Sequence, residues 1–471
     1  MTLGVDGTET LGEAMFGSAE LGDRRRTARL AATFDQLRRH PGSTLPNKLA
    51  SPPDLKALYR LMDRPEVTHE SLMTPLRAYT LKNMAACRGA VVLIHDATEL
   101  DYTDRQPLAE HLGQIGSGWG RGYICQNVLA VDSQTHSVLG LLDQILHCRD
   151  RVPKTETLPE HRARATRESL LWIKGTRHLP RDRRCVDVAD QGADTFEFLE
   201  HEYHGGRTFV IRACKCRVVQ GGHDGQGPEQ YLSDYVHGLP ELDRFTMDVQ
   251  SQRNSDGSFR PARTEAEFAV RGGPVLIHPP HARCGEHGNA PLPLYAVLLT
   301  EVHPPKGEEP VEWLLLTNEP VNGFEDAWRV ASWYECRWVV EEYHKGMKTG
   351  CGVEELQFTT ADRLQPAIAL LSAVALTLLD LRDASRRDDA KARPATTVIS
   401  HDYVAVLTAW RYGEVRPEIS VHDFYYALAR LGGHQNRTHD KRPGWLVLWR
   451  GWAKLQAMLD GYLTARRKRC G

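Results

Sequence analysis

The sequence predicts an α/β protein that contains more than one domain. The chain has 471 residues, and domains are usually about 100 to 200 residues long, so it has room for several folded units. Helical patterning dominates both ends, and strand-like apolar runs alternate with helical segments between them. With 41% hydrophobic and 25% charged residues and a mean hydropathy of -0.45, the composition is that of a globular protein. It excludes collagen-like, low-complexity and wholly disordered chains.

The first 70 residues are expected to be helical and to carry a dense cluster of positive charge. Apolar residues recur with helical spacing over residues 11–16, 21–30 and 55–62. The formal net charge of the whole chain is only -2, so any preference for nucleic acid must come from particular regions. The clustered arginines are Arg24, Arg25, Arg26, Arg29, Arg38 and Arg39. Their density favours a phosphate partner, and a solvated helix face is the alternative.

A buried strand is predicted at residues 90–96, because an almost continuous apolar run is typical of a strand covered on both faces. This run ends in Asp96. Three further β segments, at 100–103, 122–131 and 137–146, predict a three-strand meander. A helix is expected at about 161–174. A strand at 185–190 then ends in Asp190 and is followed by a helix through Phe198.

The second half of the chain is expected to contain a β-rich insertion followed by helices. Strand-like runs separated by Gly- and Pro-rich loops extend over about 205–318. Helices are predicted at about 324–349 and 366–383, with a polar linker at 384–396 and a small helical unit after it. The longest apolar stretch, 366–379, is shorter than the roughly 20 residues of a membrane span, so a buried helix is expected. These patterns predict domains at 1–70, 71–365 and 366–471.

Polar side chains within residues 333–349 are spaced so that they share one side of a helix. At about 100° per residue, one narrow stripe contains Tyr334, Arg337, Glu341, Lys345 and Lys348. The opposite side contains Val339, Val340, Tyr343 and Met347. A helix with a packed face and a polar face that presents one carboxylate among cations is therefore predicted. The alternative is a solvated surface on which Glu341 pairs with Lys345.

Three carboxylates are candidates for metal binding. Asp96 and Asp190 end two apolar strands, and Glu341 lies on the later helix. If the three converge, their oxygen atoms make the kind of site that holds Mg²⁺ or Mn²⁺. Two such ions about 3.5 to 4 Å apart can activate an attacking oxygen and stabilise the leaving oxygen at phosphorus. An aspartate at a strand end is otherwise a turn or capping residue, and the nearby competitors are Asp101, Asp187 and Asp194.

The pattern Tyr334-x-x-Arg337-x-x-x-Glu341-x6-Lys348 resembles the Y-R-E-K signature of the DDE transposases of the insertion sequence four family. Other similar segments are His95-Asp96-Ala-Thr-Glu-Leu, the run from Asp190 to Leu199, residues 21–30, Leu431-Gly-Gly and Trp449-Arg-Gly-Trp452. The resemblance therefore spans essentially the whole chain. It implies an RNase H-like catalytic core with an inserted β subdomain, flanked by a helical N-terminal domain that binds DNA ends and a helical C-terminal dimerisation domain.

The resemblance also implies roles for individual residues. Asp96, Asp190 and Glu341 match the acidic triad that binds two Mg²⁺, for which Mn²⁺ can substitute. Arg25, Arg26 and Arg29 match the element that binds the terminal inverted repeat, and Arg212 is a further expected DNA-binding residue. The residues that hold the transposon-end backbone and the flipped base are matched by Tyr334, Arg337, Lys345 and Lys348. Trp313 matches the wedge that stacks on that base. A buried core position is the alternative for Trp313. Gln191 and Gly192 depart from the family, where charged residues follow the second aspartate.

The activity implied by the resemblance is cut-and-paste DNA transposition. The implied partners are double-stranded DNA, both transposon ends and target, and a second copy of the chain in a homodimeric DNA complex, without a nucleotide cofactor or a membrane. The ten cysteines include no CxxC pair, and Asp6 and Glu9 argue against a secretory signal, so a reducing bacterial cytoplasm with association to the nucleoid is expected. The alternatives are an RNase H-like nuclease without strand transfer and an inactive or inhibitory DNA-binding relative.

Two other patterns are given no catalytic role. The glycine-rich residues 113–122 lack the Lys-Ser/Thr of a nucleotide-binding loop and predict a β-turn. His281, Cys284 and His287 are three possible zinc ligands, but no fourth is evident, so a structural zinc site is not expected there.

Overall fold

The fold is taken from a computed structural model that describes residues 10–39, 44–49, 51–153, 155–182, 184–249, 252–253, 259–260, 262–281, 284–287, 290–437, 440 and 442–469. The chain divides into two compact units, each assembled from separate stretches of sequence. The first unit comprises residues 1–88, 97–166 and 338–471, and the second comprises residues 89–96 and 167–337. Strand β1 (Val91–Asp101) belongs to both, because the division falls between Asp96 and Ala97.

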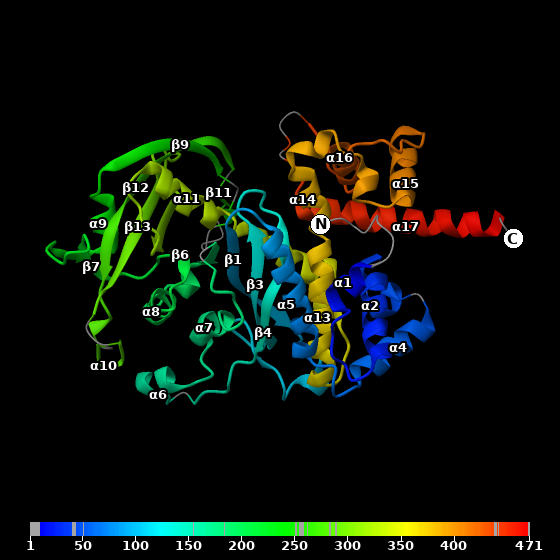
Figure 1. The fold of residues 1–471 in the computed structure, drawn as a ribbon, viewed down its shortest axis with the longest axis horizontal. Coiled ribbons are helices and arrows are strands. Elements are labelled where there is room, and N and C mark those ends of the chain that lie inside the picture. Colours follow the sequence, from blue (N-terminus) through cyan, green and yellow to red (C-terminus); the bar gives the residue numbers. More distant parts are fainter. Residues whose placement is uncertain are drawn as a thin grey trace. The chain divides into compact units, whose positions relative to one another are not determined.

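The described part of the first 70 residues is helical, as predicted. Its helices are α1 (Leu11–Phe16), α2 (Arg24–Arg39), α3 (Leu45–Lys48), α4 (Pro52–Met62) and the start of α5 (His69–Ala86) (Figure 1). Side-chain caps fix where these helices begin. Thr10 and Glu13 form a capping box at α1, and the Asp23 carboxylate accepts a hydrogen bond of 2.8 Å from the Arg25 N–H at the start of α2.

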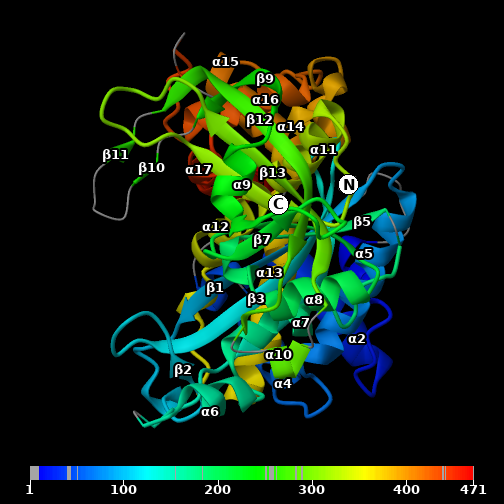
Figure 2. The same ribbon diagram turned by 90° about the vertical axis from the view of Figure 1, so that its left-hand side faces the viewer.

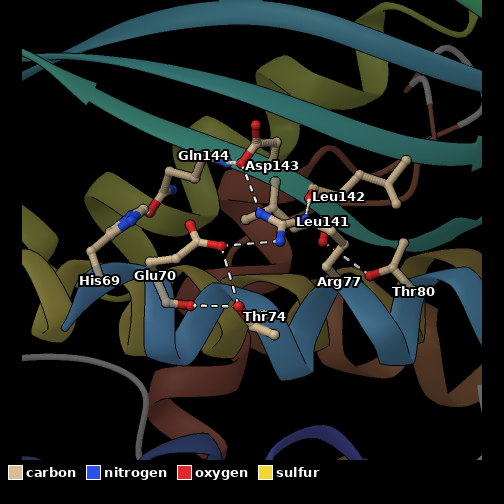
Figure 3. A network of polar contacts seen from close by, with 9 residues as sticks. All are labelled: His69, Glu70, Thr74, Arg77, Thr80, Leu141, Leu142, Asp143 and Gln144. Atoms are coloured by element: carbon tan, nitrogen blue, oxygen red, sulfur yellow. Dashed lines mark hydrogen bonds and ion pairs between the residues drawn. The ribbon is translucent and has the colours of Figure 1, made fainter. Parts of the chain in front are cut away.

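The first unit also contains a short β-hairpin and a long one. They are formed by β2 (Gly113–Gln114) with β3 (Arg121–Asp132), and by β3 with β4 (Val138–His147). Helix α5 packs on β4 through Arg77 (Figure 3). The Arg77 Nε donates to the Leu142 carbonyl at 2.9 Å, and its Nη2 lies 3.2 Å from the Asp143 carboxylate. The arginine thereby satisfies a backbone carbonyl and a buried carboxylate of the strand.

Helix α13 (Ala361–Thr377) is the centre of the first unit. It packs against α2, α4, α5 and β4, and residues on all of its sides are buried, which explains its lack of a polar face. Residues Ala361–Arg386 are long and apolar enough to cross a membrane, but 72% of the most apolar window is buried inside the structure. The remaining helices of this unit are α6 (Leu158–Ala163), α12 (Trp338–Lys345), α14 (Asp380–Arg386), α15 (His401–Tyr412), α16 (Val421–Leu431) and α17 (Trp445–Arg469).

The second unit is built on a mixed sheet in which strands far apart in the sequence are neighbours. Its strand order is β1, β5 (Cys185–Ala189), β6 (Thr208–Arg212), β14 (Glu312–Thr317), β13 (Leu292–Glu301), β12 (Arg263–Ile277), β7 (Val218–Gly221) and β8 (Glu229–Tyr231), and β9 (Glu241–Val249) pairs with β12. The first three are parallel, whereas β14 and the strands beyond it pair antiparallel. The long strands β12 and β13 and the adjacent α9 (Leu232–His237) are visible in Figures 1 and 2.

The β-rich segment extends the sheet that contains β5 and β6, and it shares one hydrophobic core with them. That core joins Phe198 and Phe209 to Val275, Leu294 and Leu316. The other elements of this unit are α7 (Leu171–Gly175), α8 (Phe196–His204), α10 (Cys284–His287), α11 (Phe324–Glu335) and the two-residue strands β10 (Gln252–Arg253) and β11 (Phe259–Arg260). The strands predicted between 208 and 317 are therefore present, and they add to the edge of the parallel strands.

Several predicted element boundaries were wrong. Strand β1 continues to Asp101, so Asp96 lies within a strand and residues 100–103 are not a separate one. The helix predicted at 161–174 is two short helices, α6 and α7. Helix α13 begins at Ala361, and α14 together with short 3₁₀ turns occupies much of the predicted linker 384–396. Such errors arise because turns inside a helix-forming segment depend on tertiary packing that periodicity does not record.

Candidate functional site

Asp96 lies within β1, and Asp190 directly follows β5, the adjacent parallel strand of the second unit. The β1–β5 register pairs His95 with Ala189, so the next residues along the two strands are Asp96 and Asp190. Neighbouring strands are about 4.8 Å apart, so the backbone at Asp96 is close to that at Asp190, which caps the 3₁₀ turn Gln191–Ala193 after β5. One oxygen of each carboxylate already has a partner: Asp96 Oδ2 is 2.8 Å from Arg337 Nη1, and Asp190 Oδ1 accepts a 2.8 Å hydrogen bond from the Gly192 N–H.

Cationic and aromatic side chains of the same unit surround these carboxylates. Tyr334, which is almost fully buried, accepts a hydrogen bond from Arg212 and packs edge-to-face against Trp313, with ring centroids 5.3 Å apart. Burial raises the pKa of Tyr334, and the charge of Asp190 adds to that effect, whereas Arg337 and Arg212 oppose it. Trp313 is half-buried, so part of its ring remains accessible for stacking. The structure therefore brings together Asp96, Asp190, Arg212, Trp313, Tyr334 and Arg337.

The single helix predicted at about 324–349 is interrupted. The five polar residues predicted to share one stripe therefore do not lie on one continuous helix. Helix α11 ends at Glu335, the Arg337 N–H bonds to the Tyr334 carbonyl at 3.0 Å in a tighter turn, and α12 begins at Trp338. Residues Gly346–Gly350 then form a π-helix, which has more residues per turn than an α-helix. A constant 100° step therefore does not hold from Tyr334 to Lys348. Tyr334 and Arg337 belong to the second unit, and the other three polar residues belong to the first.

Within α12 and the following turn, the predicted split between a packed and a polar side is confirmed. The residues on the predicted packed side are all buried: Val339, Val340, Tyr343 and Met347. Glu341 and Lys348 are partly exposed and Lys345 is exposed. The Lys348 ammonium lies 3.3 Å from Glu354, whose same oxygen accepts a 2.9 Å hydrogen bond from the Asp101 N–H. The neighbour of Glu341, Glu342, forms an ion pair with the buried Arg382 of α14, which anchors the helix.

The aspartate pair supplies some, but not all, of the ligands that a divalent cation needs. In the portion of the chain that the structure describes, no three His, Cys, Asp or Glu side chains are grouped closely enough to hold a metal ion. Two neighbouring carboxylates nevertheless supply the hard oxygen ligands that Mg²⁺ prefers, since Mg²⁺ is commonly held by one or two carboxylates with water and substrate phosphates. Asp96 and Asp190 could therefore hold such an ion, with Arg337 giving up its contact to Asp96.

Four charged or ionisable side chains form a buried network next to this pair, and the sequence reasoning missed it. His95 Nε2 is 2.7 Å from Asp187 Oδ1, and Asp187 Oδ2 accepts a 2.7 Å hydrogen bond from Arg207 Nε. Glu202 of α8 lies 3.4 Å from the same Arg207 nitrogen. The signal that could have identified this network is Asp187 in the middle of an apolar strand, because a buried charge requires a partner.

The arginines of α2 differ in how much they are available to a ligand. Arg25 is 92% exposed and its partner is the local Asp23, and Arg29 is 45% exposed and pairs with Asp54. Arg26 is mostly covered, because its guanidinium donates to the Leu21 carbonyl at 2.9 Å and pairs with Glu66. Of the three arginines assigned to the inverted repeat, Arg25 and Arg29 are thus the two that can better exchange a surface ion pair for a phosphate.

Replacing Arg25 and Arg29 together with alanine is expected to weaken DNA binding and to reduce its salt dependence. Each lost phosphate contact lowers the slope of log K against log salt by about 0.9. The slope can be measured by fluorescence anisotropy with a labelled duplex over a series of salt concentrations. Arg411→Ala, which changes an exposed arginine of α15, is the control and should leave the slope unchanged. An unchanged slope in the double variant would exclude phosphate contacts by these two arginines.

The other two sequence patterns have structural explanations. Residues 113–122, predicted as a β-turn, form the β2–β3 hairpin, in which residues 115–120 connect the two strands. His287 Nδ1 lies 2.7 Å from Glu200, and its ring packs against Phe196. His281 is exposed, and the side chain of Cys284 lies outside the described residues. Among the residues that are described, nothing assembles a zinc site around His287.

Residues 9–67 of the chain match the family described as Transposase DNA-binding. The matched segment contains α1 to α4 and the arginines of α2. The match supports DNA as a partner and supports a transposase as the class of protein. It covers the N-terminal helices, so the chemistry of the aspartate pair has to be argued from the site itself.

Proposed function

We propose that this chain is a cut-and-paste DNA transposase with an RNase H-like catalytic core. The observation that carries the proposal is the pair of carboxylates on adjacent parallel elements, Asp96 within β1 and Asp190 directly after β5, beside cationic and aromatic side chains. The N-terminal similarity to transposase DNA-binding domains supplies the substrate class. A site with oxygen ligands next to cations suits phosphoryl transfer, because this reaction depends on positioning and electrostatic stabilisation.

Glu341 is proposed as the third carboxylate of the triad. Its spacing from Tyr334 and Arg337 follows the Y-R-E-K signature, and it lies on the polar side of α12, partly exposed. The side chains on either side of it in the helix are held in place, since Val340 is buried and Glu342 is paired with Arg382. A helix fixed in this way can present one carboxylate without losing packing.

The proposed reaction is a series of phosphoryl transfers at the end of the element. Bound Mg²⁺, or Mn²⁺ in its place, would activate the attacking oxygen and stabilise the leaving oxygen. Water breaks a P–O3′ bond and leaves a 3′-hydroxyl on the transposon. That hydroxyl attacks the opposite strand, displaces the 3′-oxygen of the flanking DNA and forms a hairpin. A second water opens the hairpin. The regenerated 3′-hydroxyl then attacks a phosphodiester of the target and displaces the 3′-oxygen of the target strand, which leaves as a 3′-hydroxyl.

In this scheme, the remaining side chains of the site hold DNA. Arg212, Arg337, Lys345 and Lys348 bind backbone phosphates, for which their charges are suited. Tyr334 supports Trp313, and the accessible part of the Trp313 ring stacks on a flipped base while the hairpin forms. Two of these cations form ion pairs with carboxylates in the structure, Arg337 with Asp96 and Lys348 with Glu354. DNA phosphates would replace those carboxylates.

The proposal extends to the organisation of the protein. It assigns residues 1–70 to binding the terminal inverted repeats, 71–365 to catalysis and 366–471 to dimerisation. Two copies of the chain would bind the two ends and then the target, in a bacterial cytoplasm and associated with the nucleoid. Neither a nucleotide cofactor nor a membrane takes part in the proposed reaction.

The test is cleavage of a duplex that carries the element's own end, in Mg²⁺ or Mn²⁺, on a gel that resolves hairpins. The wild type is expected to give specific nicks and a hairpin band, and Asp190→Ala is expected to give neither while still binding. Nicking without hairpins or strand transfer would support an RNase H-like nuclease instead. Binding without cutting in either metal would support an inactive DNA-binding relative.

A further inference from the structure

One tryptophan of the first unit is almost completely exposed. The Trp119 side chain is 89% exposed, whereas the other exposed tryptophans among the described residues, Trp338, Trp410 and Trp328, are 46%, 44% and 37% exposed. An indole in water forgoes the favourable burial of a large apolar surface. Because the Trp119 ring is so exposed, at the tip of the β2–β3 hairpin, it can contact another molecule.

The hairpin holds Trp119 at a defined position. The Ile115 N–H bonds to the Gly120 carbonyl at 3.1 Å and closes the loop, and the Ile115 side chain is buried beneath it. Gln114 Nε2 donates to the Gly118 carbonyl at 3.0 Å. Gly116 has a φ of +58°, which favours glycine, and its N–H bonds to Glu99 at 2.8 Å. A constrained loop presents an aromatic ring with little loss of entropy on binding.

Hydrogen bonds connect the base of this hairpin to Lys348 within the same unit. The Arg121 N–H donates to Thr103 Oγ1 at 2.9 Å, and Thr103 Oγ1 donates to Asp101 Oδ1 at 2.6 Å. The Asp101 N–H then donates at 2.9 Å to the Glu354 carboxylate, which pairs with Lys348. Arg121 and Arg149 flank the hairpin, and Arg149 Nη1 lies 3.3 Å from the Gln114 carbonyl and pairs with Glu99. Three hydrogen bonds and one ion pair thus join Lys348 to the base of the hairpin within one unit.

We propose that Trp119 stacks on an unpaired or distorted base of the DNA that the protein binds. The inference rests on the proposed function, which assigns Lys348 to the DNA backbone, and it adds a second aromatic contact, remote in the sequence from Trp313. The flanking arginines suit a nucleic-acid strand. The exposed face of the ring suits a base, because stacking needs only a flat π surface and tolerates any sequence.

Photocrosslinking identifies such a contact directly. A duplex of the element's end and a non-specific duplex with a mispaired bubble would carry 5-iodouracil, which crosslinks to stacked aromatic side chains in near-ultraviolet light. Trypsin releases residues 106–121 as one peptide, in which Trp119 and His111 are the only aromatic rings. A crosslink on this peptide is expected in the wild type, is retained in Trp119→Phe and is lost in Trp119→Ala.

Binding measurements complete the test. Trp119→Ala is expected to weaken DNA binding about fivefold or more, the effect of losing one stacked base, while Trp119→Phe and the control Trp410→Ala stay near wild type. Absence of the crosslink from both duplexes, or unchanged binding by Trp119→Ala, would overturn the inference. A wild type that cuts the end without this crosslink refutes only the Trp119 contact. A wild-type protein that crosslinks to the bubble duplex through Trp119, but neither binds nor cuts the element's end, refutes the proposed function.

Discussion

Glu341→Gln is expected to lower metal-dependent cleavage on the order of a thousandfold while leaving end binding within about twofold of wild type. The substitution keeps the size of the side chain and removes the negative charge that would stabilise the transition state through bound cations, and loss of one such electrostatic group typically has an effect of this size. The partly exposed position of Glu341 on α12 accommodates glutamine without repacking. Single-turnover cleavage and anisotropy on the same duplex measure the two quantities.

The matched control for this prediction is Glu335→Gln. Glu335 is the last residue of α11, is exposed and lies six positions before Glu341. Glu335→Gln removes the same charge as Glu341→Gln, but Glu335 has no proposed role. This variant should therefore cut at the wild-type rate. Cleavage by Glu341→Gln at the wild-type rate would remove this residue from the triad. A loss of binding equal to the loss of cleavage would indicate that it positions DNA instead.

Asp187→Ala is expected to destabilise the second unit by about 3 to 5 kcal/mol, the usual effect of removing one partner from a buried ion pair. The variant would leave Arg207 facing Glu202 alone and would leave His95 without its hydrogen-bond acceptor. Hydrogen exchange of peptides from β1, β5 and β6 measures the local loss of stability. Unchanged exchange in those strands would show that the network does not stabilise them.

Glu202→Gln is the contrasting variant in the same network, and it is expected to keep or raise stability at alkaline pH. Burial, followed by the charge of Asp187, raises the pKa of Glu202 well above its ordinary value. The folded protein therefore holds a proton that the unfolded chain releases, so the contribution of Glu202 is complete below its unfolded pKa of about 4.3 and is lost as the pH rises through its folded value. Glutamine mimics the protonated form and removes that loss.

Asp187 has the opposite pH dependence. Burial alone would raise its pKa, but hydrogen bonds and charges from His95 and Arg207 outweigh that effect, and the net pKa is lowered. Its contribution is therefore present above the ordinary pKa of about 3.9 and is lost as the pH falls through the folded value. Denaturant unfolding of Glu202→Gln and wild type between pH 5 and pH 9 separates the two residues. A wild-type stability that does not fall towards pH 9 relative to Glu202→Gln would contradict the assignment.

Much of the secondary structure could be predicted because it is encoded locally. The helical N-terminal region, the hairpin of residues 121–147 and strand β5 before Asp190 follow from apolar spacing and turn residues. The buried side of α12 was predicted from spacing as well, because eight residues are too few for the angular error to accumulate. Over 334–348 the same reasoning failed, since a tight turn at Arg337 and a π-helix at Gly346–Gly350 change the angle per residue.

The sequence by itself determined which residues can perform chemistry: two aspartates after or within apolar strands, a glutamate among cations and a group of arginines in the first helices. Only the tertiary structure decided that Asp96 and Asp190 are neighbours, that Arg337 holds Asp96, that Arg26 is covered while Arg25 is open, and that Asp187 completes a buried network. These facts depend on pairing between strands and on burial. Both arise from contacts between residues far apart in the chain, which local spacing does not specify.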